Sequence, residues 1–382
     1  MAGAHVSSVA AALGVTTRSL RVLHVTTDLD IGGAENMLAS LATKRGEPGV
    51  EHMVASLVPN GALAPRLRAA GVAVWEFNFR SLAAPLEVVR LAGLIRRASP
   101  DVVQGWMYHG NLAASLALVL SRRRARTALV WGLRCSDMDL SQYTAQLRFV
   151  VRAGAALSRG PDVVTANSDA GLAWHLKLGY RPRRTLVVPN GIDIDRFQPD
   201  ERARETIRRS LGLGSDAFVL AHVARLDPMK DHQTFLAAMR SVPGAHALLV
   251  GAGTERLPDQ PRILRLGHRD DIPRLLAASD AVVSSSAYGE GFCTALAEGM
   301  ACGLPALATE VGDARKILGE TGYVVPPRDR GALGDAIKKL LGEARHVRVA
   351  RGRAARERIA TQFSLEAAER RFADLYRSLA GA

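Results

Sequence analysis

Two glutamates that stand eight residues apart, Glu290 and Glu298, mark the clearest chemical pattern in the sequence, EGFCTALAEGMACGLP at 290–305. Gly289 and Gly291 bracket Glu290, and glycine lets a backbone approach a ligand closely. The pattern predicts a helix that begins near residue 292, and the first turn of a helix has unpaired N–H groups. Here they would belong to Phe292, Cys293 and Thr294. Because such a turn binds anions, the segment predicts a site for an anion such as a diphosphate.

The two carboxylates would have different tasks at such a site. Glu298 lies about two helical turns beyond Glu290, where it could accept hydrogen bonds from a ribose diol. Glu290 would then face a reacting sugar. The simpler interpretation is one carboxylate that stabilises the helix N-terminus and a second that is solvated. The glycines beside Glu290 favour the first interpretation.

A basic pair follows the first expected strand in the second half of the chain, within ARLDPMK at 224–230. Ligands bind at the carboxyl ends of the strands in doubly wound sheets. Arg225 and Lys230 would therefore lie where fixed positive charges can neutralise a departing diphosphate, a task that other enzymes give to a metal ion. Taken alone, either residue would be interpreted as an ordinary surface cation.

Two further candidates follow strands in the first half. Gly32 and Gly33 lie in the loop LDIGGAE (29–35), where the backbone can approach a phosphate at a helix N-terminus. His109 follows an expected strand at 101–106. The alternative for the two glycines is a tight turn without function, and the alternative for His109 is a structural histidine. Both candidates are therefore supported only together with the other motifs.

Other chemistries have little support. Gly251-Ala252-Gly253 follows a strand, but no third glycine completes a dinucleotide-binding fingerprint, and the end of a P-loop is absent. The cysteines, Cys135, Cys293 and Cys302, are too few and too scattered for a disulfide framework or a zinc site. A reducing cytoplasm is the expected compartment. No apolar run is long enough to span a membrane.

The motifs stand at the ends of short apolar runs that alternate with helical patterns. Strands are expected at 21–27, 50–57, 72–77, 101–106, 127–133 and 162–167, and then at 218–223, 246–250, 263–266, 281–285 and 305–308. Apolar strands separated by helices of about 10 to 15 residues indicate parallel βαβ units. The expected fold class is therefore α/β, with two Rossmann-like, doubly wound halves.

The domain organisation follows from a break in this alternation at Pro189-Asn190-Gly191, a turn signal. A length of 382 residues suits two or three domains at about 150 residues each. The expected segments are a flexible extension (1–19), a first Rossmann-like domain (20–188), a linker (189–199) and a second Rossmann-like domain (200–364). A terminal helix at 365–382 is expected to join the first domain.

Together, these motifs resemble those of the retaining glycosyltransferases of family 4, which have the GT-B fold. The resemblance covers residues 20–379. It rests on GGAE (32–35), VPNGIDIDRF (188–197), ARLDPMK (224–230), LGHRDDI (266–272) and EGFCTALAEGMACGLP (290–305). Glu290 and Glu298 match the family's E-x7-E pattern, and Arg225 and Lys230 match its basic pair. Each segment alone is a weak signal, but five in order on two Rossmann-like halves are a strong one.

The resemblance implies two domains that face each other across a cleft, with a nucleotide-sugar donor bound mainly by the second. Arg225 and Lys230 would hold its diphosphate, and Glu298 its ribose. The base would contact the backbone of the segment that runs from His268 and Arg269 to Asp271. Glu290 would contact the donor sugar and help to stabilise an oxocarbenium-like transition state. The remaining donor contacts would come from Gly291, Phe292, Cys293 and Thr294.

The first domain would complete the site. His109 would reach the donor sugar from across the cleft, and Gly32 and Gly33 would face the phosphate or the acceptor. With Glu290, Arg225 and Lys230, His109 forms the expected catalytic set. Transfer would retain the anomeric configuration, and the resemblance implies no metal ion or other cofactor.

Three positions depart from the family's pattern. Gly312-Asp313-Ala314-Arg315-Lys316 stands where the family usually has Gly-Gly-x-x-Glu, although a Gly-Asp form is familiar in one branch. Asp231 follows Lys230 where glycine is common. Cys293 replaces a more usual glycine or proline, and a packed small residue is favoured over a reactive thiol at a helix N-terminus.

The net charge of +13 is divided unevenly. Residues 1–190 hold 22 basic and 12 acidic residues, a balance of +10, whereas residues 191–382 hold 28 and 25, a balance of +3. The excess therefore lies on the half that should face the acceptor. A helix at 85–98 carries Arg90, Arg96 and Arg97 beside apolar Leu86, Val89 and Leu94. Arg122, Arg123, Arg124 and Arg126 follow the next helix, which is expected at 111–121.

This distribution suits docking to an anionic membrane surface that carries a polyprenyl-diphosphate-linked acceptor. The alternative is a solvated face in a chain where Arg outnumbers Lys 44 to 6. The first expected function is transfer of a hexose-type sugar to a lipid-linked glycan in cell-envelope polysaccharide or glycolipid biosynthesis, at the inner face of the cytoplasmic membrane. A soluble transferase for a small acceptor is the second. Nucleic-acid binding is a distant third, because only the charge favours it and no recognition motif is present.

Overall fold

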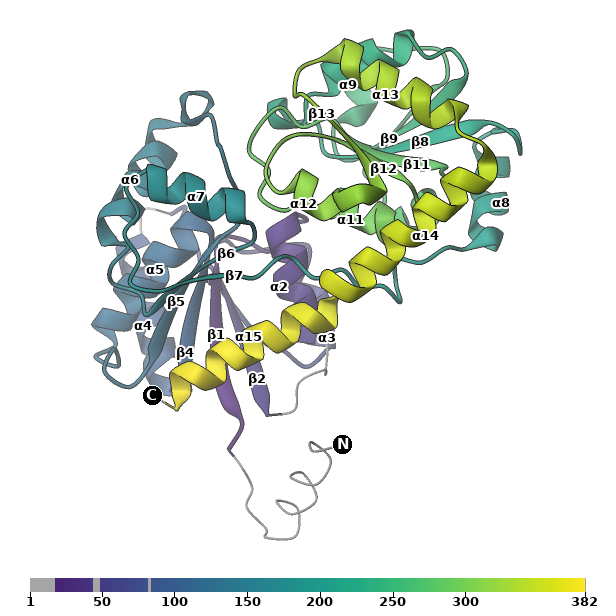
Figure 1. Cartoon of the computed structure of the whole chain (residues 1–382). Helices are drawn as coiled ribbons and strands as arrows, with labels where there is room; N and C mark the ends of the chain where they lie inside the picture. The colour runs from purple at the N-terminus through teal and green to yellow at the C-terminus, as the bar shows by residue number, and fades with distance from the viewer. Residues whose placement is uncertain (1–17, 44–48, 82–83, 382) are drawn as a thin grey trace, which may run out of the picture.

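The computed structural model of the protein describes residues 18–43, 49–81 and 84–381. The extension expected at 1–19 lies almost entirely outside these residues. Figure 1 shows two α/β halves side by side, each with a central sheet covered by helices on both faces. The expected fold class, two Rossmann-like doubly wound domains, is confirmed.

The first half is built on a seven-stranded parallel sheet in the order β3-β2-β1-β4-β5-β6-β7. Its strands are β1 (Leu20–Thr26), β2 (Val50–Ser56), β3 (Ala73–Glu76), β4 (Val102–Trp106), β5 (Ala128–Leu133), β6 (Val163–Ala166) and β7 (Thr185–Val187). Its helices are α2 (Gly33–Thr43), α3 (Ala64–Ala69), α4 (Ala84–Ala98), α5 (Met107–Leu120), α6 (Ala145–Leu157) and α7 (Asp169–Lys177). Strand β4 is buried along its whole length, as a sheet covered on both faces requires.

The second half has a six-stranded parallel sheet in the order β10-β9-β8-β11-β12-β13. Its strands are β8 (Phe218–Val223), β9 (Ala245–Val250), β10 (Ile263–Gly267), β11 (Ala281–Ser284), β12 (Ala306–Thr309) and β13 (Gly322–Val325). Its helices are α8 (Glu201–Ser210), α9 (His232–Arg240), α10 (Ile272–Ala277), α11 (Thr294–Ala301), α12 (Ala314–Leu318) and α13 (Arg330–Gly342).

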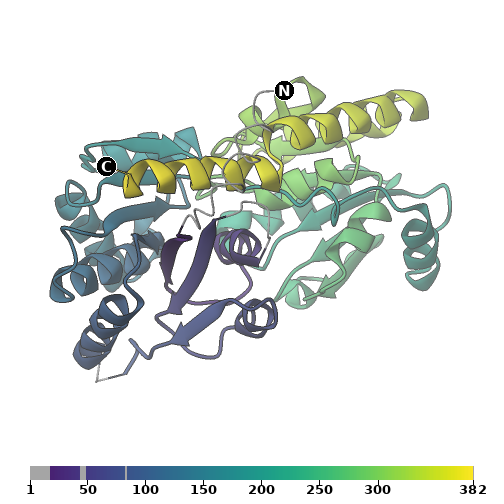
Figure 2. The ribbon, with the colours of Figure 1, turned by 90° about the horizontal axis from the view of Figure 1, so that it is seen from below.

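The last two helices connect the halves. Helix α14 (Arg345–Gln362) lies on the second half, and α15 (Leu365–Ala380) runs back along the first, as Figures 1 and 2 show in yellow. The apolar face of α15 is buried in the first core, where Phe372 and Tyr376 have no exposed surface. The junction of the two helices pairs with the linker, because Ile192 N donates to Phe363 O and Leu365 N donates to Ile192 O. The two crossings of the chain between the halves are thus bonded to each other.

The eleven strands expected from the sequence are present, and the structure adds β7 and β13. Two expected helix starts were wrong. Helix α5 begins at Met107 and not at residue 111, because Met107 adopts a φ of +61° that turns the chain directly out of β4. Helix α11 begins at Thr294 and not near Phe292, whose buried ring packs 5.5 Å from that of Phe363.

Candidate active site

The loop that carries Glu290 lies where the two halves meet. The Ser136 hydroxyl, just beyond β5 of the first half, donates to the backbone oxygen of Glu290. On the other side, Gly312 adopts a φ of +60°, and Asp313 N donates to Gly291 O over 3.0 Å. A Cβ at Gly312 would overlap the Glu290 backbone oxygen. The backbone of Glu290 is therefore held between one residue of each half.

The Glu290 carboxylate is held by the predicted cation. Glu290 is 8% exposed, and its Oε1 contacts Lys230 Nζ and accepts from the Ser286 hydroxyl over 2.8 Å. Burial lowers the pKa of Lys230, but the neighbouring Glu290 carboxylate outweighs that effect and raises it above the ordinary value. The structure thus joins two predicted residues that lie sixty positions apart in the chain, with Lys230 protonated.

Arg225 stays more open than Lys230. Its side chain is 57% exposed and pairs with Asp227 over 3.1 Å. It interacts electrostatically with Glu35 of α2, in the opposite half, whose pKa is raised to about 7, mainly because the carboxyl group is buried. Arg225 therefore lies on the second half and faces the start of α2.

The amino-terminal ends of α2 and α11 converge. A Cβ at Gly33, the first residue of α2, would lie 3.4 Å from the Thr294 hydroxyl at the start of α11. Both first turns contain unpaired N–H groups and the positive end of a helix dipole. Gly33 and Thr294 thus meet at a place that suits an anion. Because α11 begins at Thr294, the N–H groups of Phe292 and Cys293 belong to the preceding loop and not to its first turn.

Glu298 lies one helical turn further along α11 and is partly buried. Burial raises the pKa of its carboxyl group to about 7, against a smaller opposing effect of the Arg196 guanidinium in the linker. A carboxylate in this state changes charge near neutrality. The structure therefore places Glu298 near Arg196 of the linker.

The other predicted residues have different surroundings. His109 is partly buried in the first turn of α5, and burial lowers the pKa of its imidazole, so the ring is neutral at pH 7. His268 is exposed beyond β10, and Arg269 pairs with Asp271 over 2.7 Å. Within the described part of the chain, no hydrogen bond or ion pair joins these three residues to Glu290. Cys293 is 5% exposed and packs in the core beside α11, and burial raises the pKa of its thiol to about 11, which argues against a reactive thiolate.

Several residues at this junction escaped the sequence analysis. The Asp313 carboxylate, 8% exposed, accepts from the backbone N–H groups of Asp169 and Ala170 over 2.9 and 3.0 Å. It thereby caps α7 of the first half from the second half. Lys316 adds an ion pair with Asp169. The departure from Gly-Gly-x-x-Glu at 312–316 was a usable signal, but only the structure shows its partner.

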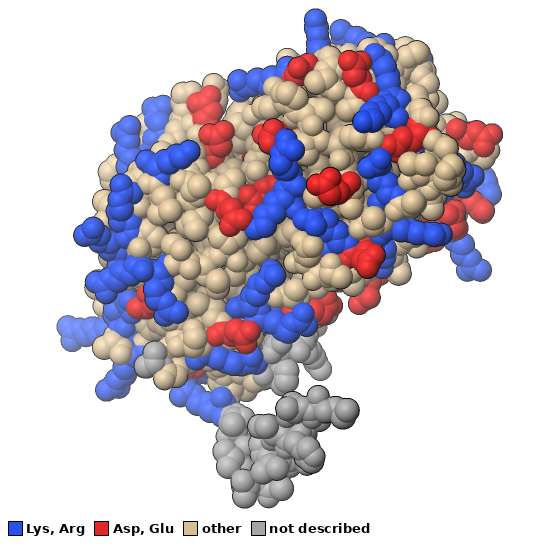
Figure 3. Space-filling model, viewed as in Figure 1, with Lys and Arg blue, Asp and Glu red and all other residues tan. Residues whose placement is uncertain are grey.

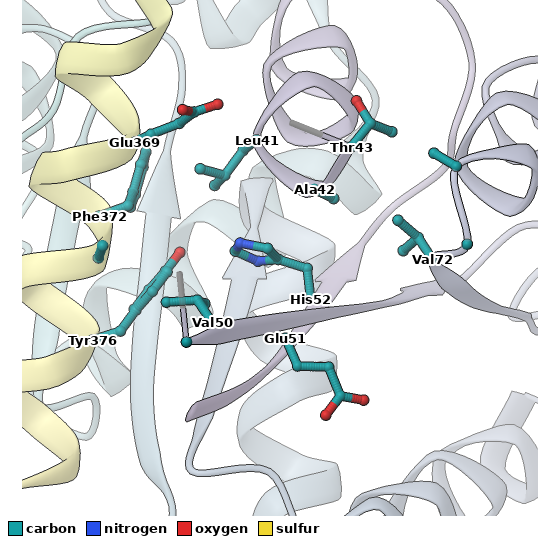
Figure 4. Close-up of a pocket in the computed structure, with 14 residues that line it drawn as sticks. Leu41, Ala42, Thr43, Val50, Glu51, His52, Val72, Glu369, Phe372 and Tyr376 are labelled. Carbon is teal, nitrogen blue, oxygen red and sulfur yellow. The ribbon is translucent and has the colours of Figure 1, made fainter. Parts of the chain in front are cut away.

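A cavity of about 330 Å³ lies elsewhere, beside the start of β2 (Figure 4). His52, Glu369 and Tyr376 are among its lining residues. It includes none of the predicted site residues. Across the described ranges, no group of three or more His, Cys, Asp or Glu side chains could hold a metal ion, and no helix is long and apolar enough to cross a membrane.

Comparison with known families identifies both halves. Residues 31–196 match the model described as Glycosyltransferase Family 4, and residues 217–343 match the model described as Glycosyl transferases group 1. The chain belongs to glycosyltransferase family 4. Its resemblance to this family, stated from five short motifs, is confirmed.

Individual family members match parts of the chain. D-inositol 3-phosphate glycosyltransferase from Geodermatophilus obscurus is 36% identical over 203 residues, which cover 46% of this chain and 44% of that protein. The protein of the same description from Mycobacterium tuberculosis strain H37Ra is 33% identical over 199 residues, which cover 47% and 41%. The chain therefore aligns with less than half the length of these curated relatives.

The fold of this family 4 chain has solved counterparts. The crystal structure of Anabaena HepE in complex with UDP-glucose superimposes with a TM-score of 0.82, at 23% sequence identity, over 94% of this chain and all of that one. At this identity the likeness shows the shared GT-B fold.

Proposed function

We propose that this protein transfers a hexose-type sugar from a nucleoside diphosphate to an acceptor, with retention of the anomeric configuration. The observation that carries the proposal is the contact between the Lys230 ammonium and the Glu290 carboxylate, on a loop that touches both halves. This pair combines a fixed cation for a leaving diphosphate with a carboxylate for a developing positive charge on the sugar.

The surroundings of the pair support the proposed donor geometry. Arg225 and Lys230 supply positive charge on the second half, and the first turns of α2 and α11 add backbone donors. The diphosphate would lie among them, the ribose against Glu298, and the base near residues 268–271. Charge neutralisation by Arg225 and Lys230 would make a metal ion unnecessary. His109, neutral at pH 7, would donate or accept a hydrogen bond at the sugar.

The relatives and the fold neighbours suggest substrates to test first. HepE was crystallised with UDP-glucose, so a UDP-sugar is the first donor to try. For the acceptor, we propose a lipid-linked glycan. The specific alternative is a small phosphorylated polyol, which the name of the D-inositol 3-phosphate glycosyltransferases favours.

A UDP-sugar is expected to stabilise the protein against heat. A ligand that binds only the folded state, at 100 times its Kd, adds about 2.7 kcal/mol to the free energy of unfolding. A thermal-shift screen of UDP-, GDP- and ADP-sugars measures this effect. NMR of the transfer product then reports the anomeric configuration. Absence of any shift with all three donor classes, or an inverted product, would contradict the proposal.

Membrane docking has support from exposed apolar side chains on three neighbouring helices, α4, α5 and α6. They are Leu86, Val89, Leu116, Val119, Leu120, Phe149 and Leu157, which we call the apolar face. Exposed arginines lie on the same helices or just beyond their ends, at positions 90, 96, 97, 122, 126, 152 and 159. Figure 3 shows basic side chains along this outer edge of the first half, on the left. Leu94 does not belong to this face, because it is 4% exposed and packs in the core.

We therefore propose that the protein works in the cytoplasm, on the inner face of the membrane. Vesicles of phosphatidylglycerol and phosphatidylcholine are expected to bind it at low salt and to release it at high salt. Leu86→Asp with Val89→Asp should weaken sedimentation with these vesicles. Val347→Asp with Val349→Asp, at partly exposed positions on α14 of the other half, is the matched control. If both double variants bound the vesicles equally well, the assignment of the apolar face as the membrane-binding surface would be wrong.

Donor affinity is expected to fall as the pH drops through about 7, the pKa of Glu298 in the free protein. The ionised carboxylate accepts two hydroxyl hydrogen bonds, whereas the protonated form accepts less well. Calorimetric titration with UDP from pH 6 to 8 measures this dependence, and Glu298→Gln should remove it. Glu357→Gln, exposed on α14, is the control.

The pH dependence of protein stability should have the opposite sign to that of donor affinity. A carboxyl group whose pKa is higher in the folded than in the unfolded protein destabilises the fold as the pH rises from about 4.5 to 7. Glu298→Gln should therefore melt at a higher temperature than the wild type at pH 8, while it binds the donor more weakly. A wild-type affinity that does not change with pH would contradict the role of Glu298.

A further inference from the structure

Arg134 is a buried cation at the junction of the halves. It follows β5, is 7% exposed, and stacks over the Trp106 ring at 4.3 Å. Its Nη1 donates to Asn190 Oδ1 over 3.1 Å. No described atom accepts a hydrogen bond from its Nε or Nη2, although both are buried. A buried charge without a bonded carboxylate is costly, so its retention here needs a reason.

The contact with Asn190 continues into the second half. Asn190 belongs to the linker and is 2% exposed. Its Nδ2 donates to the Thr294 hydroxyl over 3.0 Å, at the first residue of α11. Arg134, Asn190 and Thr294 therefore form one hydrogen-bonded chain from the first half to the start of α11. We call this chain the relay.

The direction of the hydrogen bonds in the relay is fixed by chemistry. A guanidinium only donates, so Asn190 must present its oxygen to Arg134. The amide nitrogen of Asn190 then faces Thr294, whose oxygen accepts. The Thr294 hydroxyl proton is left to point away from Asn190, and among the described residues nothing accepts it.

We infer that Arg134 and Asn190 are positioning residues, which hold the Thr294 hydroxyl as a hydrogen-bond donor to the diphosphate of the nucleotide sugar. The inference rests on the proposed function and assigns a diphosphate contact to a side chain on α11. The relay connects the first half, through the linker, to the donor site. Occupation by a dianionic ligand would also compensate the buried charge of Arg134, which no bonded carboxylate neutralises in the free protein.

The residues around Thr294 are consistent with a hydroxyl that donates toward the proposed diphosphate site. The Thr294 oxygen lies 3.4 Å from the Cβ position of Gly33, so the hydroxyl stands between the first turns of α2 and α11. Burial lowers the pKa of Arg134, and the smaller opposing effects come from Tyr376 and then from the carboxyl group of Glu35. The pKa of Arg134 is lowered to about 10, so the guanidinium remains charged at pH 7 and continues to donate.

The first test removes the hydroxyl. Thr294→Val keeps the shape of the side chain. It should lower the affinity of the protein for UDP and for inorganic pyrophosphate by about 10- to 100-fold, as expected for a lost hydrogen bond to a charged group. Thr294→Ser keeps the hydroxyl and should bind both probes within about threefold of the wild type. Thr206→Val, exposed on α8, is the matched control. Isothermal titration with each probe gives the dissociation constants.

The second test reverses the relay. Asn190→Asp presents two acceptor oxygens, so the Thr294 hydroxyl must donate to the new carboxylate and not to the ligand. The same carboxylate neutralises Arg134, so the variant should melt at or above the wild-type temperature while it binds UDP at least tenfold more weakly. A purely structural role for Asn190 predicts no such separation of stability from binding.

The double variant Asn190→Asp with Thr294→Val separates the relay from simple charge repulsion. If Asn190→Asp acts through the hydroxyl, the double variant binds UDP no more weakly than the weaker single variant. Additive losses would overturn the relay, as would wild-type affinity in Thr294→Val. With either result, UDP binding by the wild type would still support the proposed function. A wild type that binds neither UDP nor pyrophosphate would overturn both.

Discussion

Lys230→Ala is expected to remove nearly all sugar transfer, with a fall in kcat on the order of 10²- to 10³-fold, because a fixed cation no longer neutralises the leaving diphosphate. Glu290→Ala should lose transfer to a similar extent. In each case the partner group loses its main contact, since Lys230 Nζ and Glu290 Oε1 bind each other at the loop between the halves. The measurement is the initial rate of transfer with the donor found in the thermal-shift screen.

Glu290→Gln distinguishes chemistry from folding in this pair. The amide oxygen can still accept from Lys230 and Ser286, so the loop should keep its conformation while the negative charge is lost. Lys338→Ala, on the exposed surface of α13, is the control for removal of a lysine. Circular dichroism and thermal melting verify the fold of each variant. If Lys230→Ala or Glu290→Ala turned over close to the wild-type rate, the assignment of the site would be wrong.

The sequence was a good guide to the parts of the site that a single strand end or helix start creates. Lys230 follows β8 and Glu290 precedes α11, and the topology of a parallel sheet brings such positions to one edge. The same rule places Gly33 at the start of α2. Local pattern and sheet topology therefore suffice to predict that these residues meet.

Contacts between the halves could not be predicted in this way. Ser136, Asn190 and Asp313 act through partners more than 100 residues away, and their residue types are common in loops. Nothing in the spacing of a lone serine or aspartate names its partner. The helix starts at Met107 and Thr294 were misplaced for another reason. The start of α5 follows from the positive φ of Met107, and the start of α11 from the packed ring of Phe292. Neither feature produces a periodic pattern in the sequence.

Gly312→Ala is the second substitution with a large expected effect. Gly312 has a φ of +60°, and a Cβ there would overlap the Glu290 backbone oxygen and lie 2.6 Å from Gly291 O. Both atoms belong to backbone, so the loop that carries Glu290 must move. A displacement of about 1 Å at a reacting group can cost 100-fold in rate. We therefore expect transfer to fall about 100-fold, while the second half stays folded.

Gly212→Ala separates this contact from backbone strain alone. Gly212 has a φ of +66°, close to that of Gly312, but nothing lies within 4 Å of its Cβ position. Both variants carry the strain of a left-handed alanine, roughly 1–2 kcal/mol, and should lose similar thermal stability from it. Only Gly312→Ala should also lose transfer. If Gly312→Ala and Gly212→Ala transferred sugar at equal rates, backbone strain alone would explain both variants. The position of the Glu290 backbone would then not limit the reaction.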